Sequence, residues 1–405
     1  DCLKHAVHRP GSQHNKPESK TRVKVSLKFV AEKGKIPMLN KLYFHQYRCL
    51  QNFEVTLKEE HSALLLGRNG AGKSSFFDAV EVLQQIGRGV TQLKDLVSES
   101  DFAFGETHKP IHLEIAATLG KQVYEYVLEV ELPENFSQVR IRQESLKVNG
   151  KTHFVREEGK IQLGKSAEFT LDWHHVGLPL ISTRNDDAPI ARFREWLARI
   201  IVLAPVPGDF RRASKQETPY LARKASNTLD WVRHQLAVYP ALYTKIEEFM
   251  KLRMPDFANF KFESTGKDEK ELVFKFSGDG SKSLELNFHQ LSDGEKIYFL
   301  TATVLAAITN EESILCLWDE PDNYISLPEL SHFITACRKA FENSAVESQL
   351  VMSSHNPRTI NEYSEHNTFL VTRQSHLHPS RLERAADKEY LSATFVDAYE
   401  NGELD

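Results

Sequence analysis

The sequence lacks the features that would place it in a membrane or cross-link it covalently. None of its apolar runs approaches the roughly 20 residues that a helix needs to cross a bilayer. The first residues contain no apolar segment of the kind that a secretory signal requires. The four cysteines (Cys2, Cys49, Cys316 and Cys337) lie far apart and form no CxxC pair, so neither a disulfide framework nor a structural zinc site is expected. These absences predict a cytoplasmic protein without a membrane partner.

The charge of the chain is small overall but unevenly distributed. The 405 residues carry a formal net charge of -5, which argues against a general polyanion binder. Residues 1–37, however, hold nine Lys or Arg residues against three Asp or Glu residues. We therefore expect a basic N-terminal arm, which indicates either a contact with nucleic acid or a partner, or simply a solvated terminus.

The most specific motif is the segment from Gly67 to Ser74, which reads GRNGAGKS. It fits the pattern G-x-x-x-x-G-K-[ST] and lies between an apolar run at 62–66, predicted as a buried strand, and a helix predicted over 74–86. Glycines let the backbone wrap a phosphate chain, and the N–H groups of a helix start attract the anion. Lys73 would neutralise the β- and γ-phosphates, and Ser74 would offer its hydroxyl to Mg²⁺. The motif predicts ATP and Mg²⁺, with these binding residues: Asn69, Gly70, Ala71, Gly72, Lys73, Ser74 and Ser75.

A second motif is a pair of acids at the end of an apolar run. Residues 314–318 lead into Asp319 and Glu320. Adjacent side chains on a strand point in opposite directions, so the two carboxylates can take different roles. Asp319 is predicted to hold Mg²⁺, directly or through water, and Glu320 to polarise the water that attacks the γ-phosphate. Without the glycine-rich loop, a solvated acidic turn would be the better explanation.

A third motif, LSDGEK at 291–296, opens a helix predicted to run to residue 308. Ser292 as the N-cap with Glu295 three residues later makes a capping box, and this explains the segment in purely structural terms. The same geometry leaves Ser292 and Gly294 at a helix N-terminus, where an anion is favoured. Both readings remain open from this segment alone.

Taken together, these segments resemble the motifs of ABC-type ATPases. Residues 291–296 are similar to the ABC signature, residues 321–323 resemble the D-loop, and residues 353–355 after the apolar strand 350–352 resemble the H-switch. The resemblance implies that His355 senses the γ-phosphate and acts in catalysis with Glu320 and Lys73. It also implies a homodimer, or a higher oligomer, that sandwiches ATP between its heads. Ser292, Gly294 and Glu295 would then act on the nucleotide of the partner.

The branch of this superfamily is indicated by spacing. Residues 39–57 and the wide gap between Lys73 and Ser292 resemble SMC- and RecF-like ATPases. The compact insertions look like those of bacterial anti-phage ATPases, with the PtuA-like ATPases of Septu and retron systems and the OLD family as the nearest. Too few residues follow His355 for a TOPRIM nuclease domain, and no His-Asn-His zinc pattern is visible.

The resemblance therefore implies a subunit that uses ATP-dependent head pairing to control a separate effector nuclease, suspected to be of HNH type. The alternative is a RecF- or SMC-like DNA-repair ATPase. A transporter subunit is a third reading.

The expected fold is α/β. Alternating patterns predict a strand over 22–30, two strands over 39–46 and 52–57, and an antiparallel β layer over 111–132 and 138–170 with a hairpin turn at Asn149-Gly150. Helices are predicted over 190–201, 218–237 and 242–252, and strands over 260–263, 272–276 and 284–288. Helix, strand, helix and strand follow residue 291, which suits a parallel sheet.

With the resemblance, this pattern predicts an ABC-ATPase head with a mixed and parallel sheet, an inserted antiparallel β layer and a helical insertion. We divide the chain into a basic arm (1–37), a first lobe with the phosphate-binding loop and β layer (38–189), a helical insertion (190–258) and a second lobe with the signature, the acidic pair and the H-switch (259–405).

Three groups of residues remain open at this point. The Q-loop glutamine of the family could be any of six that follow Lys73: Gln84, Gln85, Gln92, Gln122, Gln138 and Gln143. Arg48, just before the glycine-rich loop, is a candidate to reach the nucleotide. A basic cluster could track nucleic-acid phosphates, dock a nuclease or form a solvated helix face; it comprises Arg211, Arg212, Lys215, Arg223 and Lys224.

Overall fold

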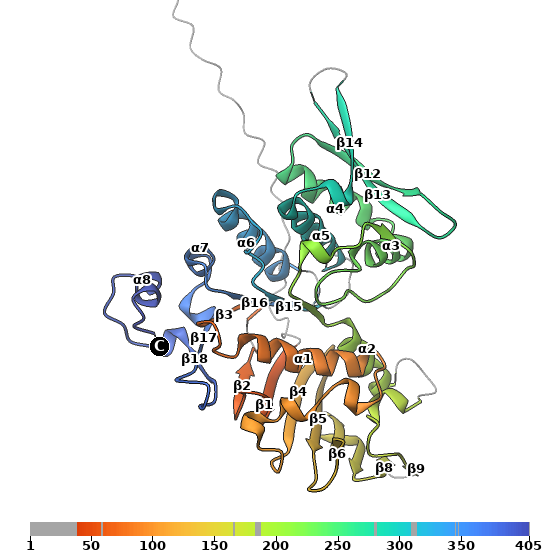
Figure 1. The fold of residues 1–405 in the computed structure, drawn as a ribbon, viewed down its shortest axis with the longest axis vertical. Coiled ribbons are helices and arrows are strands. Elements are labelled where there is room, and N and C mark those ends of the chain that lie inside the picture. The colour runs from red at the N-terminus through yellow and green to blue at the C-terminus, as the bar shows by residue number, and fades with distance from the viewer. Residues whose placement is uncertain are drawn as a thin grey trace, which may run out of the picture. The chain divides into compact units, whose positions relative to one another are not determined.

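A six-stranded sheet forms the centre of the described structure. The computed structural model describes residues 39–57, 60–164, 167–182, 188–278, 282–308, 314–344, 346 and 348–404. The strands of the central sheet are β3 (Ser62–Leu66), β10 (Ile201–Leu203), β15 (Leu315–Asp319), β16 (Gln349–Ser354), β17 (Thr368–Thr372) and β18 (Arg381–Arg384). They follow the order β10-β15-β16-β3-β17-β18 (Figure 1). Neighbours from β10 to β17 run parallel, and β18 is antiparallel to β17.

The central strands are apolar because both of their faces are buried. Every residue of β3 and of β16 is buried. Side chains alternate along a strand, so Ala63 and Leu65 enter one hydrophobic core while Leu64 and Leu66 enter a second. A continuous apolar run is the usual sequence of a parallel strand covered on both sides.

Eight helices of the described residues have these bounds: α1 (Lys73–Gly87), α2 (Pro189–Arg199), α3 (Thr228–Val238), α4 (Leu242–Arg253), α5 (Asp293–Ile308), α6 (Leu327–Glu342), α7 (Pro357–Asn361) and α8 (Phe395–Glu400). Helix α1 belongs to the first core with α2, while α5 and α6 belong to the second. The central sheet thus lies between two helical layers, which confirms the expected α/β class with a mixed and parallel sheet.

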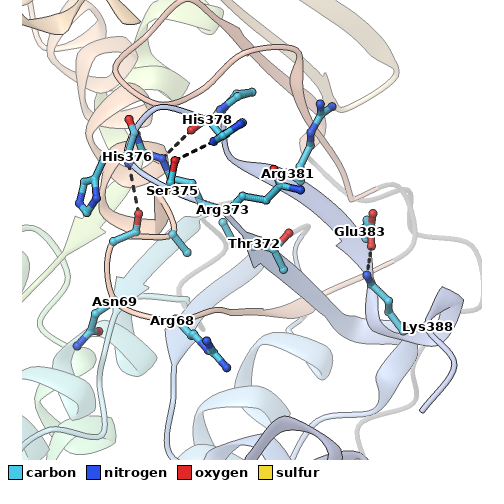
Figure 2. A pocket seen from close by; sticks show the side chains of 15 residues that line it. Arg68, Asn69, Thr372, Arg373, Ser375, His376, His378, Arg381, Glu383 and Lys388 are labelled. Carbon is cyan, nitrogen blue, oxygen red and sulfur yellow. Dashed lines mark hydrogen bonds and ion pairs between the residues drawn. The ribbon is translucent and has the colours of Figure 1, made fainter. Parts of the chain in front are cut away.

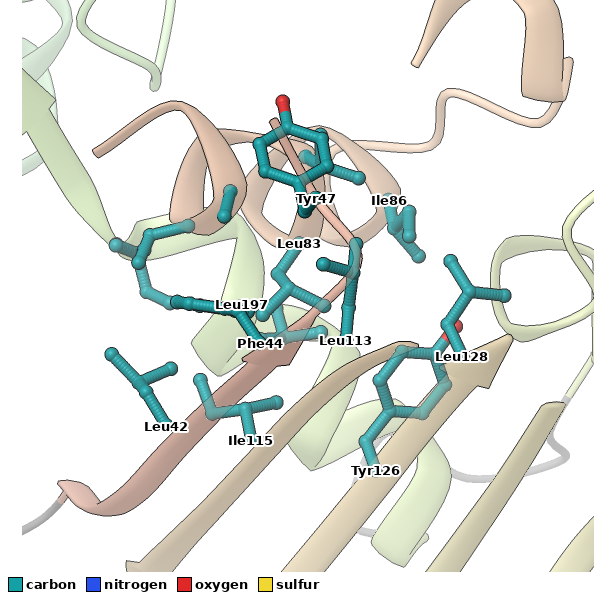
Figure 3. Close-up of a cluster of buried hydrophobic side chains, with 14 of the residues drawn as sticks. Leu42, Phe44, Tyr47, Leu83, Ile86, Leu113, Ile115, Tyr126, Leu128 and Leu197 are labelled. Atoms are coloured by element: carbon teal, nitrogen blue, oxygen red, sulfur yellow. The ribbon is translucent and has the colours of Figure 1, made fainter. Parts of the chain in front are cut away.

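An antiparallel sheet of eight strands packs against α1 in the first hydrophobic core. Its strands, in spatial order, are β2 (Phe53–Thr56), β1 (Leu39–His45), β4 (Ile111–Leu119), β5 (Gln122–Glu131), β6 (Arg140–Val148), β7 (Lys151–Glu157), β8 (Lys160–Leu163) and β9 (Ala167–Thr170). Figure 3 shows Leu83 and Ile86 of α1 facing Leu113 and Leu128 of this sheet. The predicted β layer is confirmed. Asn149 and Gly150 join β6 to β7 with φ of 50° and 75°, the left-handed values of a tight hairpin turn.

A smaller sheet covers α5 with aromatic side chains. It consists of β11 (Ala213–Ser214), β12 (Phe257–Ser264), β13 (Lys270–Ser277) and β14 (Ser283–Asn287), and β13 pairs with the other three. Phe260 and Phe274 pack edge-on against Phe299 of α5, with ring centroids 5.4 and 5.1 Å apart. Such pairs favour a defined geometry in addition to burying area. The contacts fix the start of α5 beside the central sheet.

Two local predictions in residues 190–258 are wrong. Ile201 does not continue a helix: α2 ends at Arg199, and β10 pairs in parallel with β15 in the central sheet. A short apolar run fits a buried helix or a buried strand equally well, and the pairing partner decides. The helix predicted over 218–237 begins only at Thr228. The side chain of Asn227 bonds to the backbone of Tyr220 and Ala222 and makes a turn there instead.

The basic arm 1–37 and the strand predicted over 22–30 lie outside the described residues. The division of the remaining chain at residues 190 and 259 stays a prediction.

A surface cluster on the antiparallel sheet makes stability depend on pH. His112 Nδ1 lies 3.1 Å from Glu129 Oε1, and its Nε2 lies 3.4 Å from Glu114 Oε2. Burial lowers the pKa of His112, but the hydrogen bonds to Glu114 and Glu129 outweigh burial and raise this pKa above its ordinary value. A raised histidine pKa adds stability below the unfolded pKa of about 6.5, and this stability disappears as the pH rises through the folded pKa.

We expect H112Q to lower the free energy of unfolding at pH ~5.5 by up to about 1 kcal/mol, and less at pH ~8.5. Urea unfolding at both pH values measures the difference. H332Q, at an exposed position on α6, is the control and should show no such trend. Equal losses at both pH values for H112Q would contradict the assigned cause.

Candidate functional site

The candidate site lies at one edge of the central sheet. Strands β3, β16 and β15 are adjacent and parallel, so their carboxyl ends meet at this edge. The glycine-rich loop follows β3, the acids Asp319 and Glu320 end β15, and Ser353, Ser354 and His355 end β16. The structure therefore brings three of the sequence motifs together. This edge is where ligands bind in open α/β sheets.

The glycine-rich loop is closely packed against its surroundings. At Gly67, a Cβ atom would collide with the backbone carbonyl of Val371. Gly72 has a φ of 112° and faces the side chains of Ser380 and Cys49 too closely for a Cβ atom. Only glycine fits the available space at these two positions, and only glycine readily takes the left-handed backbone of Gly72 at the N-terminus of α1. The loop can hold its backbone N–H groups toward an anion for this reason.

Lys73 places a positive charge at the end of the loop, next to the two acids. Its Nζ donates to the carbonyl oxygens of Gly67 at 2.5 Å and of Arg68 at 3.3 Å. Burial lowers the pKa of Lys73, and the nearby charges of Glu320 and Asp319 partly offset this effect. The amine is thus placed between the loop and the two acids, where a phosphate chain would meet it.

Ser74 and Asp319 form the pair predicted to hold Mg²⁺. Ser74 Oγ donates to Asp319 Oδ2 at 3.5 Å, and Ser353 Oγ donates to Asp319 Oδ1. Burial raises the pKa of Asp319, while the hydrogen bond from Ser353 lowers it by less. Neighbouring oxygen ligands of an octahedral Mg²⁺ lie about 3 Å apart and opposite ones about 4.2 Å apart. The observed separation lies between these values, so the two oxygens fit the ion after a small adjustment.

Glu320 is held by both neighbouring motifs. Its N–H donates to Ser353 Oγ at 3.0 Å, and its φ of 47° is unusual for a residue with a side chain. Asn323 Nδ2 donates to one carboxylate oxygen at 2.9 Å, and His355 Nδ1 lies 3.2 Å from the other. The left-handed backbone of Glu320 thus accompanies a carboxylate that is held between Asn323 and His355.

The segments resembling the D-loop and the H-switch are joined by buried hydrogen bonds. Asp322 is 7 % exposed, and its Oδ2 accepts from Ser354 Oγ at 2.5 Å and from Thr359 Oγ1 at 2.7 Å. A buried carboxylate requires such partners. Asn323, Ser353 and Asp322 lie within the segments that resemble the D-loop and the H-switch, but they were not predicted as site residues, and only the contacts reveal their roles.

The signature-like segment forms the predicted capping box. Ser292 N–H donates to Glu295 Oε2 at 2.7 Å, and Glu295 N–H donates to Ser292 Oγ at 3.3 Å. Ser292 is exposed, and a Cβ added to Gly294 would lie 3.1 Å from the carbonyl oxygen of Tyr324. The start of α5 therefore lies close to Tyr324, which directly follows the D-loop segment, and Ser292 is exposed. The capping box and an anion site at the helix N-terminus need the same geometry, so the structure agrees with both explanations of this segment.

Most of the predicted basic cluster is neutralised within the chain. Four of its five side chains form ion pairs: Arg211 with Asp230, Lys215 with Glu269, Lys224 with Asp209, and Arg223 with Asp78 and Glu81. The cluster also lies on an irregular segment before α3, not on a helix face. Paired cations have less charge to offer a polyanion, so this cluster is a weaker nucleic-acid site than the sequence indicated.

Arg48 lies beside the start of α1. Its Nη1 pairs with Asp78, and its Nε donates to Asp101 at 2.8 Å. It is thus near the glycine-rich loop, as expected, but held by two acids. Gln84 is buried and bonds to the carbonyl of Ile200, and Gln122 accepts from Tyr124. These contacts give two of the six glutamines structural roles, and the Q-loop stays unassigned.

A hollow of about 690 Å³ adjoins the outer side of the glycine-rich loop (Figure 2). Its other wall is the β17–β18 connection, which Arg373 stabilises by donating to the carbonyls of His376, His378 and Gly70. Ser380 Oγ donates to the carbonyl of Ala71. The connection is therefore attached to the loop at both ends, and it supports the loop from the side of β17.

Two elements of the site could not be read from sequence motifs. Arg373 and Ser380 come more than 300 positions after the loop that they support.

Within the described parts of the chain, no group of three or more His, Cys, Asp or Glu side chains is arranged to bind a metal ion. None of the described helices is both long and apolar enough to cross a membrane.

Comparisons with known proteins identify the type of domain. A family model described as "AAA domain, putative AbiEii toxin, Type IV TA system" matches residues 62–361. No curated protein matches the chain. An SMC head bound to the C-winged helix domain of ScpA is similar in structure, with a TM-score of 0.50 and 14 % identity over 86 % of this chain and 98 % of that one.

A second similar structure is an SMC head with an extended coiled coil, bound to the C-terminal domain of ScpA derived from Pyrococcus furiosus. Its TM-score is also 0.50, with 14 % identity over 86 % of this chain and 97 % of that chain. At this identity the likeness concerns the fold alone, and it agrees with the expected ABC-type head.

Proposed function

The chain belongs to this AAA-domain family and is an ATPase of that type with the fold of an SMC head, and from this premise we propose that ATP pairs two copies of it to control a separate effector nuclease in anti-phage defence. The observation that carries the proposal is the convergence of Lys73, Asp319 and Glu320 at one sheet edge. Phosphoryl transfer needs such positioning and charge, with little covalent chemistry from the protein.

The roles of the residues follow from their positions. The loop from Asn69 to Ser75 wraps the phosphate chain, and Lys73 leaves the carbonyls of Gly67 and Arg68 to neutralise it. Ser74 and Asp319 would hold Mg²⁺, which would screen the phosphate charge when bound. Glu320 accepts a proton from the attacking water, while Asn323 and His355 hold its carboxylate in place.

The second copy would complete the site with its signature-like segment. Ser292 is exposed at the start of α5, and the capping box with Glu295 holds its backbone in a fixed orientation. The N-terminus of a 16-residue helix favours negative charge. In the pair, Ser292 and Gly294 of one copy contact the γ-phosphate bound to the other copy, Glu295 holds the segment in place through the capping box, and hydrolysis removes that contact.

The defence role rests on the family and on the resemblance to PtuA-like ATPases. The family description names a toxin of a type IV toxin–antitoxin system, which supports a role in a toxic response. The SMC heads bound to parts of ScpA support the idea that a head of this fold carries a separate protein. An HNH-type nuclease is the partner that the resemblance to Septu-like ATPases implies.

The decisive experiment is co-expression of the chain with the products of adjacent genes. We expect one product, a nuclease, to co-elute with the chain in size-exclusion chromatography, and ATP to change the proportion of the complex. The K73A variant should co-elute without responding to ATP, because its loop no longer binds the nucleotide. A chain that never co-elutes with any adjacent gene product would remove the proposed effector.

The fold of an SMC head favours one second candidate, a DNA-repair ATPase gated by ATP. This candidate predicts that DNA ends or gaps accelerate ATP hydrolysis and that binding weakens steeply with salt. The internal ion pairs of the basic cluster argue against that part of the chain as the DNA contact. Hydrolysis that DNA accelerates in the absence of any nuclease partner would favour this candidate over the defence role.

A further inference from the structure

Arg223 lies at the same sheet edge as the proposed ATP site, although no motif includes it. The strand β10 pairs with β15, whose last residue is Asp319. Immediately after β10, the N–H of Ala204 donates to the carbonyl of Arg223 at 2.8 Å, and the N–H of Val206 donates to that of Lys224 at 3.2 Å. The backbone of Arg223 is therefore anchored beyond the carboxyl end of β10, next to the strand that carries the catalytic acids.

The guanidinium of Arg223 reaches the helix that follows the glycine-rich loop. Its Nη1 pairs with Asp78 and lies 2.8 Å from Glu81 Oε2. Ser74, Asp78 and Glu81 are spaced by four and three residues along α1, so they share one face of this helix. Arg223 thus lies over the helix face that carries the proposed Mg²⁺ ligand Ser74.

The electrostatics of Asp319 agree with this placement. Burial raises the pKa of Asp319, and among the charges that oppose this effect are those of Arg223 and Lys73. The Arg223 side chain is 23 % exposed and so is shielded from bulk water. A shielded arginine beside an Mg²⁺ ligand can influence the charge that develops on phosphate oxygens.

If the Arg223 side chain moved away, neither Asp78 nor Glu81 would be left as a buried carboxylate without a partner. Asp78 also pairs with Arg48, which stays in contact through Asp101. Glu81 is 29 % exposed and can be hydrated. The guanidinium is therefore held by one acid that has a second cation and by one acid that water can reach, and both can release it at modest cost.

From this geometry we propose that Arg223 is a catalytic residue of the same site, whose guanidinium leaves Asp78 and Glu81 to bind the terminal phosphates of ATP during hydrolysis. The proposal rests on the ATPase activity proposed above. Arginine suits this role because its planar fork binds phosphate oxygens in pairs and remains charged. Such an arginine stabilises the transition state more than the bound substrate, so it acts mainly on kcat.

The competing explanation is a clamp that only attaches the segment 204–227 to α1. The two explanations differ in what a substitution changes. A clamp contributes to stability and leaves hydrolysis by the folded protein intact, whereas a phosphate ligand contributes to kcat. Lys224 offers a matched control: it is the adjacent residue, carries the same charge and pairs with Asp209 at 3.2 Å, with its side chain 66 % exposed.

The test compares R223A, R223K and K224A by steady-state ATP hydrolysis, MANT-ATP binding and thermal unfolding. We expect R223A to lower kcat on the order of 100-fold while the Kd for MANT-ATP changes less than about threefold. R223K keeps a charge near Asp78 and Glu81, so it should keep the wild-type Tm and still lose about tenfold or more in kcat. K224A should match the wild type.

Wild-type kcat in R223A with a lowered Tm would overturn the proposal in favour of the clamp. If R223A does not fold, R223K decides: wild-type kcat in this variant overturns the role of the guanidinium fork. The outcome is separate from the fate of the proposed function. A wild-type chain that hydrolyses no ATP defeats that function, whereas an active wild type with an equally active R223K defeats only the role of Arg223.

Discussion

The E320Q variant is expected to lose about three orders of magnitude in kcat for ATP hydrolysis, because the amide cannot accept the proton of the attacking water. The amide keeps the size of the carboxylate, and its oxygen can still accept from Asn323, which lies 2.9 Å from the carboxylate. ATP binding should therefore persist. Steady-state hydrolysis and MANT-ATP binding measure the two properties separately.

The same variant should accumulate the ATP-bound pair of chains, since the step that removes the γ-phosphate is blocked. Size-exclusion chromatography with light scattering, with and without ATP and Mg²⁺, measures the shift in mass. E342Q is the control, because this acid lies on α6 and pairs with Arg338 of the same helix at 3.0 Å. Normal hydrolysis by E320Q would mean that another group activates the water.

The K73A variant should lose ATP affinity by about 100-fold or more, since it removes the charge-assisted contact with the β- and γ-phosphates. The loss should be seen in Kd, not in stability. In the wild type, Lys73 is buried and bonds to the carbonyls of Gly67 and Arg68, and burial lowers its pKa, so the free protein gains little from this charge. Titration with MANT-ATP and a thermal unfolding scan separate the two effects.

K94A provides the matched control for K73A, because Lys94 is an exposed lysine after the same helix. It should bind ATP as the wild type does. Unchanged ATP affinity in K73A would show that the nucleotide binds somewhere other than the glycine-rich loop, and the proposed pairing of two heads around it would then have no basis.

Local patterns were sufficient for most of the fold. The strand Ser62–Leu66 was predicted with its exact bounds, and the antiparallel layer followed from period-two alternation and the Asn149-Gly150 turn. These features depend on residues close in sequence, whose conformational preferences hold in almost any surroundings. The capping box at Ser292 and Glu295 is of the same kind.

Predictions that depended on distant pairing were less successful. Ile201 was predicted at the end of a helix, and the parallel pairing of Ile201–Leu203 with β15 makes this segment a strand. The basic cluster was predicted around and within a helix, with a nucleic-acid contact, a nuclease contact and a solvated helix face all left open, and distant acids pair with most of its charges. A charge on a sequence has no partner until the chain is folded, so its availability cannot be read from composition.

The sequence by itself determined the residue types of the candidate site: which loop has the glycine and lysine pattern expected for a phosphate chain, which acids follow the apolar strand and which helix has a serine cap. Each of these depends on residue types at short spacing. The tertiary structure alone decided that β10 lies beside β15, that Ser353 holds Glu320, and that Arg223 lies over the face of Ser74. These contacts join residues far apart in the chain, and they form only because parallel strands bring their carboxyl ends to one edge.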